Sequence, residues 1–412
     1  MTSFAPFVEL FSVDGINMAG NLDTGAVVGL TSQAMEVCQR VKSGQAESEQ
    51  ISQVDEKLHA YMSAAGFFED EPKFNHPLGA YVHVTQRCNL DCVGCYSMGA
   101  LRNCAPDPSI DQLRRTFSQL ASSGAASANI SGGEPFLRDD LCELVRIANE
   151  ECGIAIVNIV TNGTISPRFD LAELARWVGS VTVSIDGPSS DSPAFIRREQ
   201  RFSKLMSTVG ELKAAGIATR ILPTLHARNI DDVPAYVRLA KDLGVGLSFS
   251  LLSCAPECAE MASLMPDASD LKHLAELQME DVSFDEFSGP FGIALKAKRS
   301  CGAGLKSLSF DVDGGVYPCH MLQAPQFLMG NVYEEDLADI LSRSRFLVEK
   351  WLLPIERIES CGACEYGLIC GGGCRARTIN CGAGPAGEDP YCSLSKGFYQ
   401  KMFSALSASL SS

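Results

Sequence analysis

The chain has 412 residues, 46% of them hydrophobic, and its 50 acidic and 34 basic side chains give a net charge of −16. This length allows two or three domains with full cores, and the acidic balance argues against nucleic acid as the main partner, because phosphate binding needs Lys and Arg. No apolar run reaches a membrane span and no signal peptide is recognisable, so we expect a cytoplasmic protein with no membrane partner.

The first 66 residues predict a small β-then-α unit. Three strand-like runs come first, at 7–11, 16–20 and 26–30. Asp14-Gly15 between the first two runs is a strong hairpin signal. Thr31 or Ser32 can cap a helix that runs to Val41, and a second helix is expected over 47–65. This order resembles a winged-helix module, and together with a linker marked by Pro and Gly it forms a first domain at 1–78.

From residue 80, strands and helices alternate. We expect strands at 80–85, 126–131, 154–161, 181–186, 217–224 and 245–252, and helices at 109–123, 137–151, 170–178, 202–215 and 232–243. Repeated βα units predict an α/β fold with a parallel sheet, closed or partly closed, that binds ligands at the carboxyl ends of its strands.

The rest of the chain divides by composition. We place the βα region at 79–265, a bridging region at 266–300, a Cys-rich domain at 301–395 and a C-terminal helix at 396–412. The Cys-rich domain has few long periodic elements, so we expect metal ligation, and not an apolar core of its own, to hold it together. The chain contains 17 cysteines, and clustered thiols in a cytosolic protein favour metal binding over disulfides.

Three cysteines follow the first βα strand directly, in the sequence CNLDCVGC: Cys88, Cys92 and Cys95. A closed zinc or iron site takes four ligands, so three thiols leave one metal position open for chemistry. The loop lies at the carboxyl end of the sheet, where such folds place their active sites. A zinc knuckle with its fourth ligand elsewhere is the alternative.

This CxxxCxxC spacing resembles the signature of radical S-adenosylmethionine (radical SAM) enzymes, whose fold is a partial (β/α)6 TIM-like barrel. The resemblance implies that the three thiolates hold a 4Fe-4S cluster and that its fourth iron binds the amino and carboxylate groups of S-adenosylmethionine. One electron then yields a 5′-deoxyadenosyl radical, which abstracts a substrate hydrogen. Gly94 departs from the usual aromatic residue at its position. Its backbone would face the adenine, and Tyr96 could replace the missing ring.

Motifs at the ends of the next strands extend the resemblance. SGGEP resembles the GGE motif that receives the cofactor ammonium, and glycine there lets the backbone approach the ligand. TNGT and SIDG are also turn sequences, but the resemblance places them on the ribose and methionine side. An arginine near residue 197 would bind the cofactor carboxylate, with Arg198 or a solvated side chain as the alternative. The implied contacts are Gly132, Gly133, Glu134, Pro135, Asn162, Ser184 and Arg197.

A second group of cysteines lies in the C-terminal domain, where a zinc ribbon would not explain seven spaced thiols. Their layout resembles the SPASM domain, which typically holds two auxiliary 4Fe-4S clusters and so implies three clusters in all. The resemblance assigns one auxiliary cluster to Cys361, Cys364, Cys370 and Cys392, and the other to Cys301, Cys319 and Cys374. Cys381 could supply a fourth ligand to the second set; otherwise that iron would be open to a substrate thiolate or water.

The resemblance covers residues 80–395 and leaves the substrate open. The N-terminal unit resembles an element that binds a leader peptide as an added strand. We therefore expect a maturase that forms a thioether, C–C or C–O crosslink in a ribosomally made precursor peptide, with flavodoxin or ferredoxin as the reductant. No catalytic residue is assigned.

Three alternatives remain. One is a formylglycine-forming sulfatase-type maturase, and another is a quinone-cofactor peptide enzyme. The third is a non-catalytic iron–sulfur or electron-transfer protein, which would have no use for a GGE motif.

Overall fold

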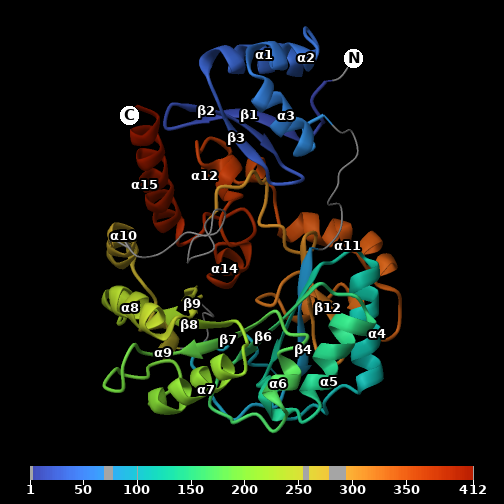
Figure 1. The fold of residues 1–412 in the computed structure, drawn as a ribbon, viewed down its shortest axis with the longest axis vertical. Helices are drawn as coiled ribbons and strands as arrows, with labels where there is room; N and C mark the ends of the chain where they lie inside the picture. Colours follow the sequence, from blue (N-terminus) through green and yellow to red (C-terminus); the bar gives the residue numbers. More distant parts are fainter. Residues whose placement is uncertain (1–2, 69–77, 100, 254–258, 278–293, 412) are drawn as a thin grey trace.

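The computed structural model describes residues 3–68, 78–99, 101–253, 259–277 and 294–411. Figure 1 shows three regions along the long axis of the molecule: the N-terminal unit, the C-terminal Cys-rich part beside and below it, and the βα region at the opposite end. None of the helices in these ranges is long and apolar enough to cross a membrane.

The N-terminal unit is a three-stranded antiparallel sheet followed by three helices. Its elements are β1 (Val8–Val13), β2 (Ile16–Asn21), β3 (Val27–Leu30), α1 (Ser32–Lys42), α2 (Glu49–Val54) and α3 (Glu56–Ala64), with strand order β1-β2-β3. The predicted hairpin is confirmed: Val13 pairs with Ile16, and Asp14 and Gly15 both have positive φ, at 47° and 77°, as a type I′ turn requires.

One helix prediction in this unit is wrong. The segment 47–65 forms two helices, because Asp55 is extended (φ −154°, ψ 107°) and its side chain accepts a hydrogen bond from Leu58 N at 3.0 Å. A carboxylate that caps the second helix in this way ends the first one. The cap predicted at Thr31 forms, with Oγ1 accepting from Ala34 N at 3.1 Å.

The βα region contains the parallel strands of a ten-stranded sheet. They are β4 (Gly79–Thr85), β5 (Ser127–Gly132), β6 (Ile156–Thr161), β7 (Ser180–Ile185), β8 (Thr219–Leu225), β9 (Gly246–Leu247) and β10 (Ser250–Leu251). The order is β10-β8-β7-β6-β5-β4, and β9 also pairs with β8. The strand predicted over 245–252 is therefore split into two short pieces, both parallel to β8.

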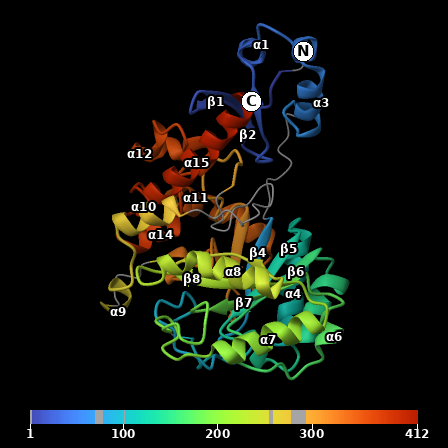
Figure 2. The same cartoon turned by 60° about the vertical axis from the view of Figure 1, so that its left-hand side comes forward.

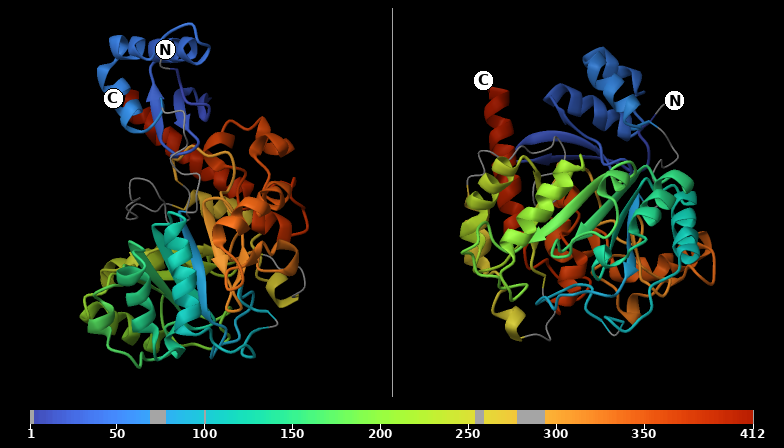
Figure 3. Two further views of the ribbon diagram at one scale, coloured as in Figure 1. Left: turned by 90° about the vertical axis from the view of Figure 1, so that its right-hand side faces the viewer. Right: turned by 60° about the horizontal axis from the view of Figure 1, so that its bottom comes forward.

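Helices cover the outer face of this sheet (Figure 3). They are α4 (Ile110–Ser122), α5 (Leu141–Arg146), α6 (Leu171–Leu174), α7 (Phe202–Ala214) and α8 (Val233–Leu243). The helices predicted over 137–151 and 170–178 are shorter than expected. The first begins only after a 3-10 turn, Pro135–Leu137, and continues as a π-helical turn, Ile147–Glu151.

Side-chain alternation separates a core from a polar interior. Residues that point outward, such as Val82, Ile130, Ile159 and Val183, are buried under the helices. Every second residue points inward, and the inward set includes polar side chains such as Ser131, Asn158 and Ser184. The inner face of the partial barrel thus carries hydrogen-bonding side chains that a ligand could contact.

The Cys-rich part shares the barrel's sheet and core. β11 (Ser307–Phe310) pairs in parallel with β4, and β12 (Gly315–Tyr317) and β13 (Gly330–Asn331) continue the sheet antiparallel. Leu308, Phe310 and Val316 belong to the same buried cluster as the barrel strands. The Cys-rich part therefore shares an apolar core with the βα region, a support that the sequence did not predict.

Helices complete the molecule. They are α9 (Ala259–Ala262), α10 (Ala268–Glu276), α11 (Leu337–Trp351), α12 (Glu359–Gly362), α13 (Gly367–Cys370), α14 (Arg375–Asn380) and α15 (Cys392–Ser411). The C-terminal helix starts at Cys392, four residues before its predicted start. It packs on α10, where a Cβ on Gly397 would lie 2.7 Å from that of Ala275.

The N-terminal sheet packs on the Cys-rich part. Val13 and Met18 share a buried cluster with Ile369, Tyr399 and Phe403, and Figure 2 shows α15 beside β1 and β2. At the hairpin tip, the Tyr366 hydroxyl donates to the Asp14 carboxylate at 2.9 Å. The unit is therefore anchored next to the C-terminal cysteines.

Candidate active site

The first cysteine loop leaves the carboxyl end of β4 and is fixed by backbone hydrogen bonds. Cys88 N donates to Asn103 Oδ1 at 2.7 Å, and Cys88 Sγ accepts from Leu90 N at 3.5 Å. Val93 N donates to Ile196 O at 2.9 Å. Cys88, Cys92 and Cys95 are free, half-buried thiols in this loop.

Gly94 has a structural reason to be glycine. Its φ is +67°, and a Cβ there would lie 3.1 Å from both Leu252 and Met261. An aromatic residue here would need a left-handed backbone conformation and would have to displace both neighbouring side chains, so glycine is favoured. Tyr96 does not fill that space, because its hydroxyl bonds to Ser131 Oγ on β5 at 2.5 Å.

The GGE segment is docked on the cysteine loop. Gly133 N donates to Thr85 O at 2.7 Å and Glu134 N donates to Arg87 O at 2.8 Å. A Cβ on Gly132 would lie 2.3 Å from Thr85 O, and one on Gly133 would lie 2.1 Å from Arg87 O. Only glycine permits this approach of the two backbones.

Glu134 is completely buried. Its Oε1 accepts hydrogen bonds from Phe136 N at 2.9 Å and Thr161 Oγ1 at 2.6 Å, and its Oε2 accepts from Asn162 N at 2.6 Å. A carboxylate has about four acceptor positions, so one remains, on Oε2. Burial raises the pKa of Glu134, and these hydrogen bonds oppose the shift.

Arg197 and Arg198 have different surroundings. Arg197 is 8% exposed and pairs with Asp186 at 2.9 Å, yet its Nε and Nη1 lack a well-aligned hydrogen-bond acceptor among the described residues. Arg198 is about half exposed and pairs with Glu260 at 2.7 Å. Of the two guanidinium groups, that of Arg197 is the buried one, and its Nε is the donor left for a ligand.

The other predicted cofactor contacts lie around the same loop. Asn162 Nδ2 is 3.8 Å from Cys88 Sγ, and its Oδ1 accepts from Thr164 N at 2.9 Å. Pro135 is buried at the start of its 3-10 turn. Ser184 is half-buried on the inner face of β7. It lies one strand further from the cysteines than Asn162, which follows β6.

Two charged residues near the site were not predicted. Asp186 stands in SIDG, a sequence that reads as a turn, and pairs with Arg197. Arg102 donates from Nη2 to Leu90 O at 3.3 Å and leaves its buried Nε and Nη1 without a partner among the described residues. Arg102 lies only seven residues after Cys95, but no motif in the sequence indicates that its guanidinium turns back to the loop.

The C-terminal cysteines line two cavities. One small cavity is lined by Cys361, Cys364, Cys370 and Cys392, together with Tyr366 and Tyr399. A larger cavity of about 350 Å³ is lined by Cys301, Cys319 and Cys374, with Cys370 on its border. The grouping thus follows the two sets that the sequence suggested, and Cys381 is not among the residues that line the larger cavity.

Basic side chains surround the larger cavity. Lys298 lines it directly. Arg377 lines it too and makes two hydrogen bonds to Asp389, at 2.7 and 2.6 Å. Burial raises the pKa of the Cys319 thiol to about 12 and that of Cys392 to about 11. Cluster assembly must therefore release protons, and at Cys392 the Lys396 ammonium favours the thiolate.

The residues present fit iron–sulfur clusters and S-adenosylmethionine. Within the described ranges, no three His, Cys, Asp or Glu side chains are arranged to hold a single metal ion. The thiols would therefore hold a larger group, such as an iron–sulfur cluster. Three free, half-buried thiols stand in one loop, seven line two cavities, and the buried Nε of Arg197 suits a carboxylate.

Comparisons with known proteins agree with this architecture. Residues 82–240 match the radical SAM superfamily, and residues 301–365 match the SPASM iron–sulfur cluster-binding domain. The PqqA peptide cyclase of Ruegeria pomeroyi is 28% identical over 352 residues, which cover 81% of this chain and 91% of the relative.

Two solved structures share the fold. That of anSMEcpe with bound AdoMet covers 80% of this chain and 94% of its own, with a TM-score of 0.63 and 21% identity. Streptococcus suis SuiB bound to the precursor peptide SuiA covers 94% of this chain and 99% of its own, with a TM-score of 0.59 and 16% identity.

Proposed function

We propose that this chain, a radical SAM enzyme with a C-terminal SPASM domain, is a peptide maturase that installs an intramolecular crosslink in a ribosomally made precursor. The observation that carries the proposal is an N-terminal sheet with an open edge, anchored beside the auxiliary cysteines. The names of the R. pomeroyi relative and of the SuiB complex support a peptide substrate.

The radical SAM domain binds S-adenosylmethionine and a 4Fe-4S cluster, and the SPASM domain binds auxiliary clusters. When bound, the cofactor supplies a carbon radical that abstracts a hydrogen atom from the substrate. We assign Cys88, Cys92 and Cys95 to the first cluster. The two cavity-lining sets hold one auxiliary cluster each, and a flavodoxin or ferredoxin supplies the first electron.

Two buried side chains bind the methionine end of the cofactor. The Arg197 guanidinium would donate to the carboxylate from Nε, which has no acceptor among the described residues, while Nη1 stays paired with Asp186. The Glu134 carboxylate accepts the ammonium at the one position on Oε2 that internal donors leave open. Asn162, whose backbone N–H donates to Glu134 and whose amide lies beside Cys88, would connect the ammonium site to the cluster loop.

Peptide recognition is assigned to the edge of β3. Asn21 N donates to Ala26 O at 2.9 Å, so by antiparallel alternation Val28 and Leu30 bond to β2, and Val27 and Gly29 face away from it. Gly29 is exposed and has no atom within 4 Å of its Cβ position. Among the described residues no strand pairs with this edge, so the outward groups of Gly29 can accept a peptide as a fourth strand.

Each outer strand has one outward carbonyl that accepts from a side chain, and the weaker, uncharged contact on β3 favours β3 over β1 as this edge. On β1, the Lys42 ammonium already takes Val8 O at 2.9 Å and pairs with the Glu9 carboxylate. Beside β3, Tyr61 of α3 is 43% exposed and its hydroxyl reaches Val27 O at 3.2 Å. A leader strand would therefore lie between β3 and α3 and cover the Tyr61 ring.

The test is a proline substitution at this edge. Gly29→Pro removes an outward N–H without touching the β2–β3 hydrogen bonds, whereas Gly29→Ala keeps the N–H and is the matched control. The probe is the leader of a precursor encoded by a short reading frame beside this gene. We expect Pro, and not Ala, to abolish leader binding measured by fluorescence anisotropy and to leave peptide-independent 5′-deoxyadenosine formation unchanged. Equal binding by both variants would refute the role of β3.

Deletion of residues 1–66 is a poorer test. The hairpin covers Tyr366, Ile369, Tyr399 and Phe403, which lie around Cys364 and Cys370. Removing it would uncover an apolar surface next to one auxiliary site, so loss of iron and loss of peptide binding could not be separated.

A further inference from the structure

Two ring-bearing residues that directly follow cysteine ligands contact each other. Tyr96 follows Cys95 in the barrel loop, and His320 follows Cys319 after β12. Their ring centroids lie 5.0 Å apart with an interplanar angle of 79°, an edge-to-face arrangement. The contact joins the loop of the first cluster to a wall of the larger auxiliary cavity, which His320 also lines.

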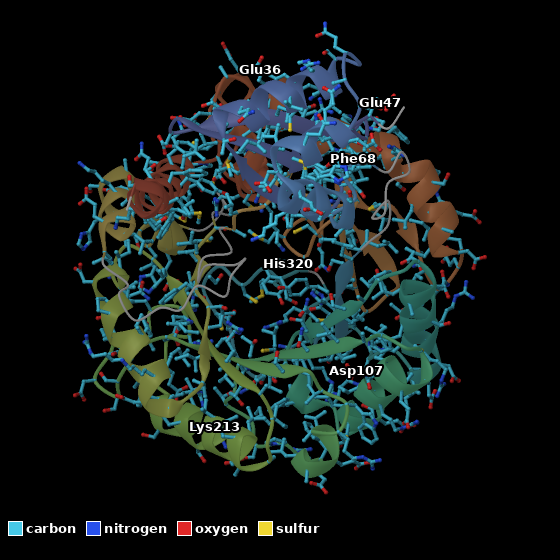
Figure 4. All side chains as sticks on the ribbon, turned by 45° about the horizontal axis from the view of Figure 1, so that its top comes forward. Glu36, Glu47, Phe68, Asp107, Lys213 and His320 are labelled. Carbon is cyan, nitrogen blue, oxygen red and sulfur yellow. The ribbon has the colours of Figure 1, made fainter. Side chains whose placement is uncertain are left out.

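The barrel holds both rings in place. The Tyr96 hydroxyl bonds to Ser131 Oγ on β5 at 2.5 Å. The His320 ring packs on Tyr81 of β4 with centroids 4.1 Å apart, and its Nδ1 lies 3.8 Å from Cys319 Sγ. Figure 4 shows His320 near the centre of the molecule, between the barrel strands and the C-terminal elements. Adjacent strands thus fix a contact between two domains.

The reaction needs an electron to cross between the domains. This electron transfer is required only if the proposed function, formation of a crosslink, holds. A crosslink that joins X–H and C–H groups of a peptide removes two hydrogens. One leaves as a hydrogen atom and ends in 5′-deoxyadenosine; the other leaves as a proton and an electron. Cofactor cleavage takes one electron from the first cluster, so the balance closes if the peptide's electron enters the auxiliary cluster and returns to the first.

We propose that the Tyr96–His320 contact carries this electron from the auxiliary cluster at Cys301, Cys319 and Cys374 to the cluster at Cys88, Cys92 and Cys95. Each ring is one residue away from a ligand of its own cluster. The route Cys319–His320–Tyr96–Cys95 therefore follows covalent bonds except at a single contact between the two rings. Tyr96 and His320 are positioning residues in this scheme, because neither needs to touch the peptide.

The test measures electron transfer between the clusters in the absence of any peptide. The reconstituted enzyme receives less than one electron per molecule by deazaflavin photoreduction. Rapid freeze-quench EPR then follows how fast the electron redistributes between the first cluster and the auxiliary clusters. Tyr96→Leu removes the ring, Tyr96→Phe keeps it without the hydroxyl, and Met98→Leu changes an exposed side chain of the same loop.

We expect Tyr96→Leu to redistribute the electron several-fold more slowly than the wild type, with iron content and cluster potentials unchanged. Tyr96→Phe and Met98→Leu should behave as the wild type. Redistribution in Tyr96→Leu at the wild-type rate would overturn the proposal, and so would equal slowing in Tyr96→Phe. If Tyr96→Leu loses iron, the pair His320→Leu and His320→Phe repeats the comparison from the other side, with slowing again expected only in the leucine variant.

The outcome is independent of the peptide assignment. No peptide is present, so a different substrate class would leave the electron measurement valid. Conversely, failure of the contact would leave peptide binding at β3 untouched. The two proposals therefore fail in separate experiments.

Discussion

Glu134→Gln tests whether the buried carboxylate binds the cofactor or only stabilises the backbone around Phe136 and Asn162. Glutamine preserves an oxygen for Phe136 N and Thr161 Oγ1, but it places an NH2 group opposite Asn162 N. One buried donor then lacks its acceptor, which costs about 1–3 kcal/mol of stability. The cofactor ammonium also loses a charged partner, worth about 1.5–3 kcal/mol, so S-adenosylmethionine should bind roughly ten- to a hundred-fold more weakly.

The assay has two readouts. Equilibrium dialysis of the reconstituted enzyme measures cofactor affinity, and urea denaturation measures stability. Glu150→Gln is the control, because this side chain is 58% exposed and its partner within the described ranges is Arg146, at the surface. A lower urea midpoint with unchanged cofactor affinity would refute the ammonium role and leave Glu134 as a structural residue.

Further predictions concern the first cluster, the two neighbouring arginines and the ion pair between Arg377 and Asp389. Replacing Cys88, Cys92 and Cys95 with Ala should remove about four of roughly 12 irons and abolish 5′-deoxyadenosine formation; retained cleavage would exclude this loop as the cluster site. Arg197→Met should weaken S-adenosylmethionine binding with iron retained, whereas Arg198→Met should not, as dialysis would show. Burial alone would raise the pKa of Asp389, but Arg377 outweighs it and holds the pKa below its ordinary value. The pair's contribution to stability is therefore complete above about pH 4 and is lost as pH falls through the lowered pKa. Asp389→Asn should cost about 3–5 kcal/mol at neutral pH and remove that acid dependence in urea titrations, and an unchanged midpoint would contradict it.

Local sequence signals predicted the elements that depend on nearby residues. Asp14-Gly15 requires a turn with positive φ at both positions, and the hairpin forms there. The strand after the linker ends immediately before CNLDCVGC, so the loop lies at the carboxyl end of the sheet. The prediction of one helix over 47–65 is wrong because Asp55 caps a second helix. An Asp followed three residues later by a buried Leu suits such a cap.

Features that depend on distant residues were not predictable. The pairing of β11 with β4 brings the Cys-rich part into the barrel core, and no periodicity within residues 301–395 reports on a partner strand more than two hundred residues away. The same is true of the Tyr96–His320 contact. The Asp186–Arg197 pair and the contact of Arg102 with Leu90 are close in the chain, but both depend on the conformation of irregular loops, which no periodicity predicts. The sequence identified ligand types and spacings, whereas the fold determined which charges and rings surround them.

Mass spectrometry of a precursor peptide incubated with the reconstituted, reduced enzyme and S-adenosylmethionine tests the central claim most directly. The account predicts a product that lacks two hydrogen atoms and carries an intramolecular crosslink, formed together with 5′-deoxyadenosine and dependent on the leader. An unchanged peptide mass, with 5′-deoxyadenosine released at the same rate whether or not the peptide is present, would contradict it.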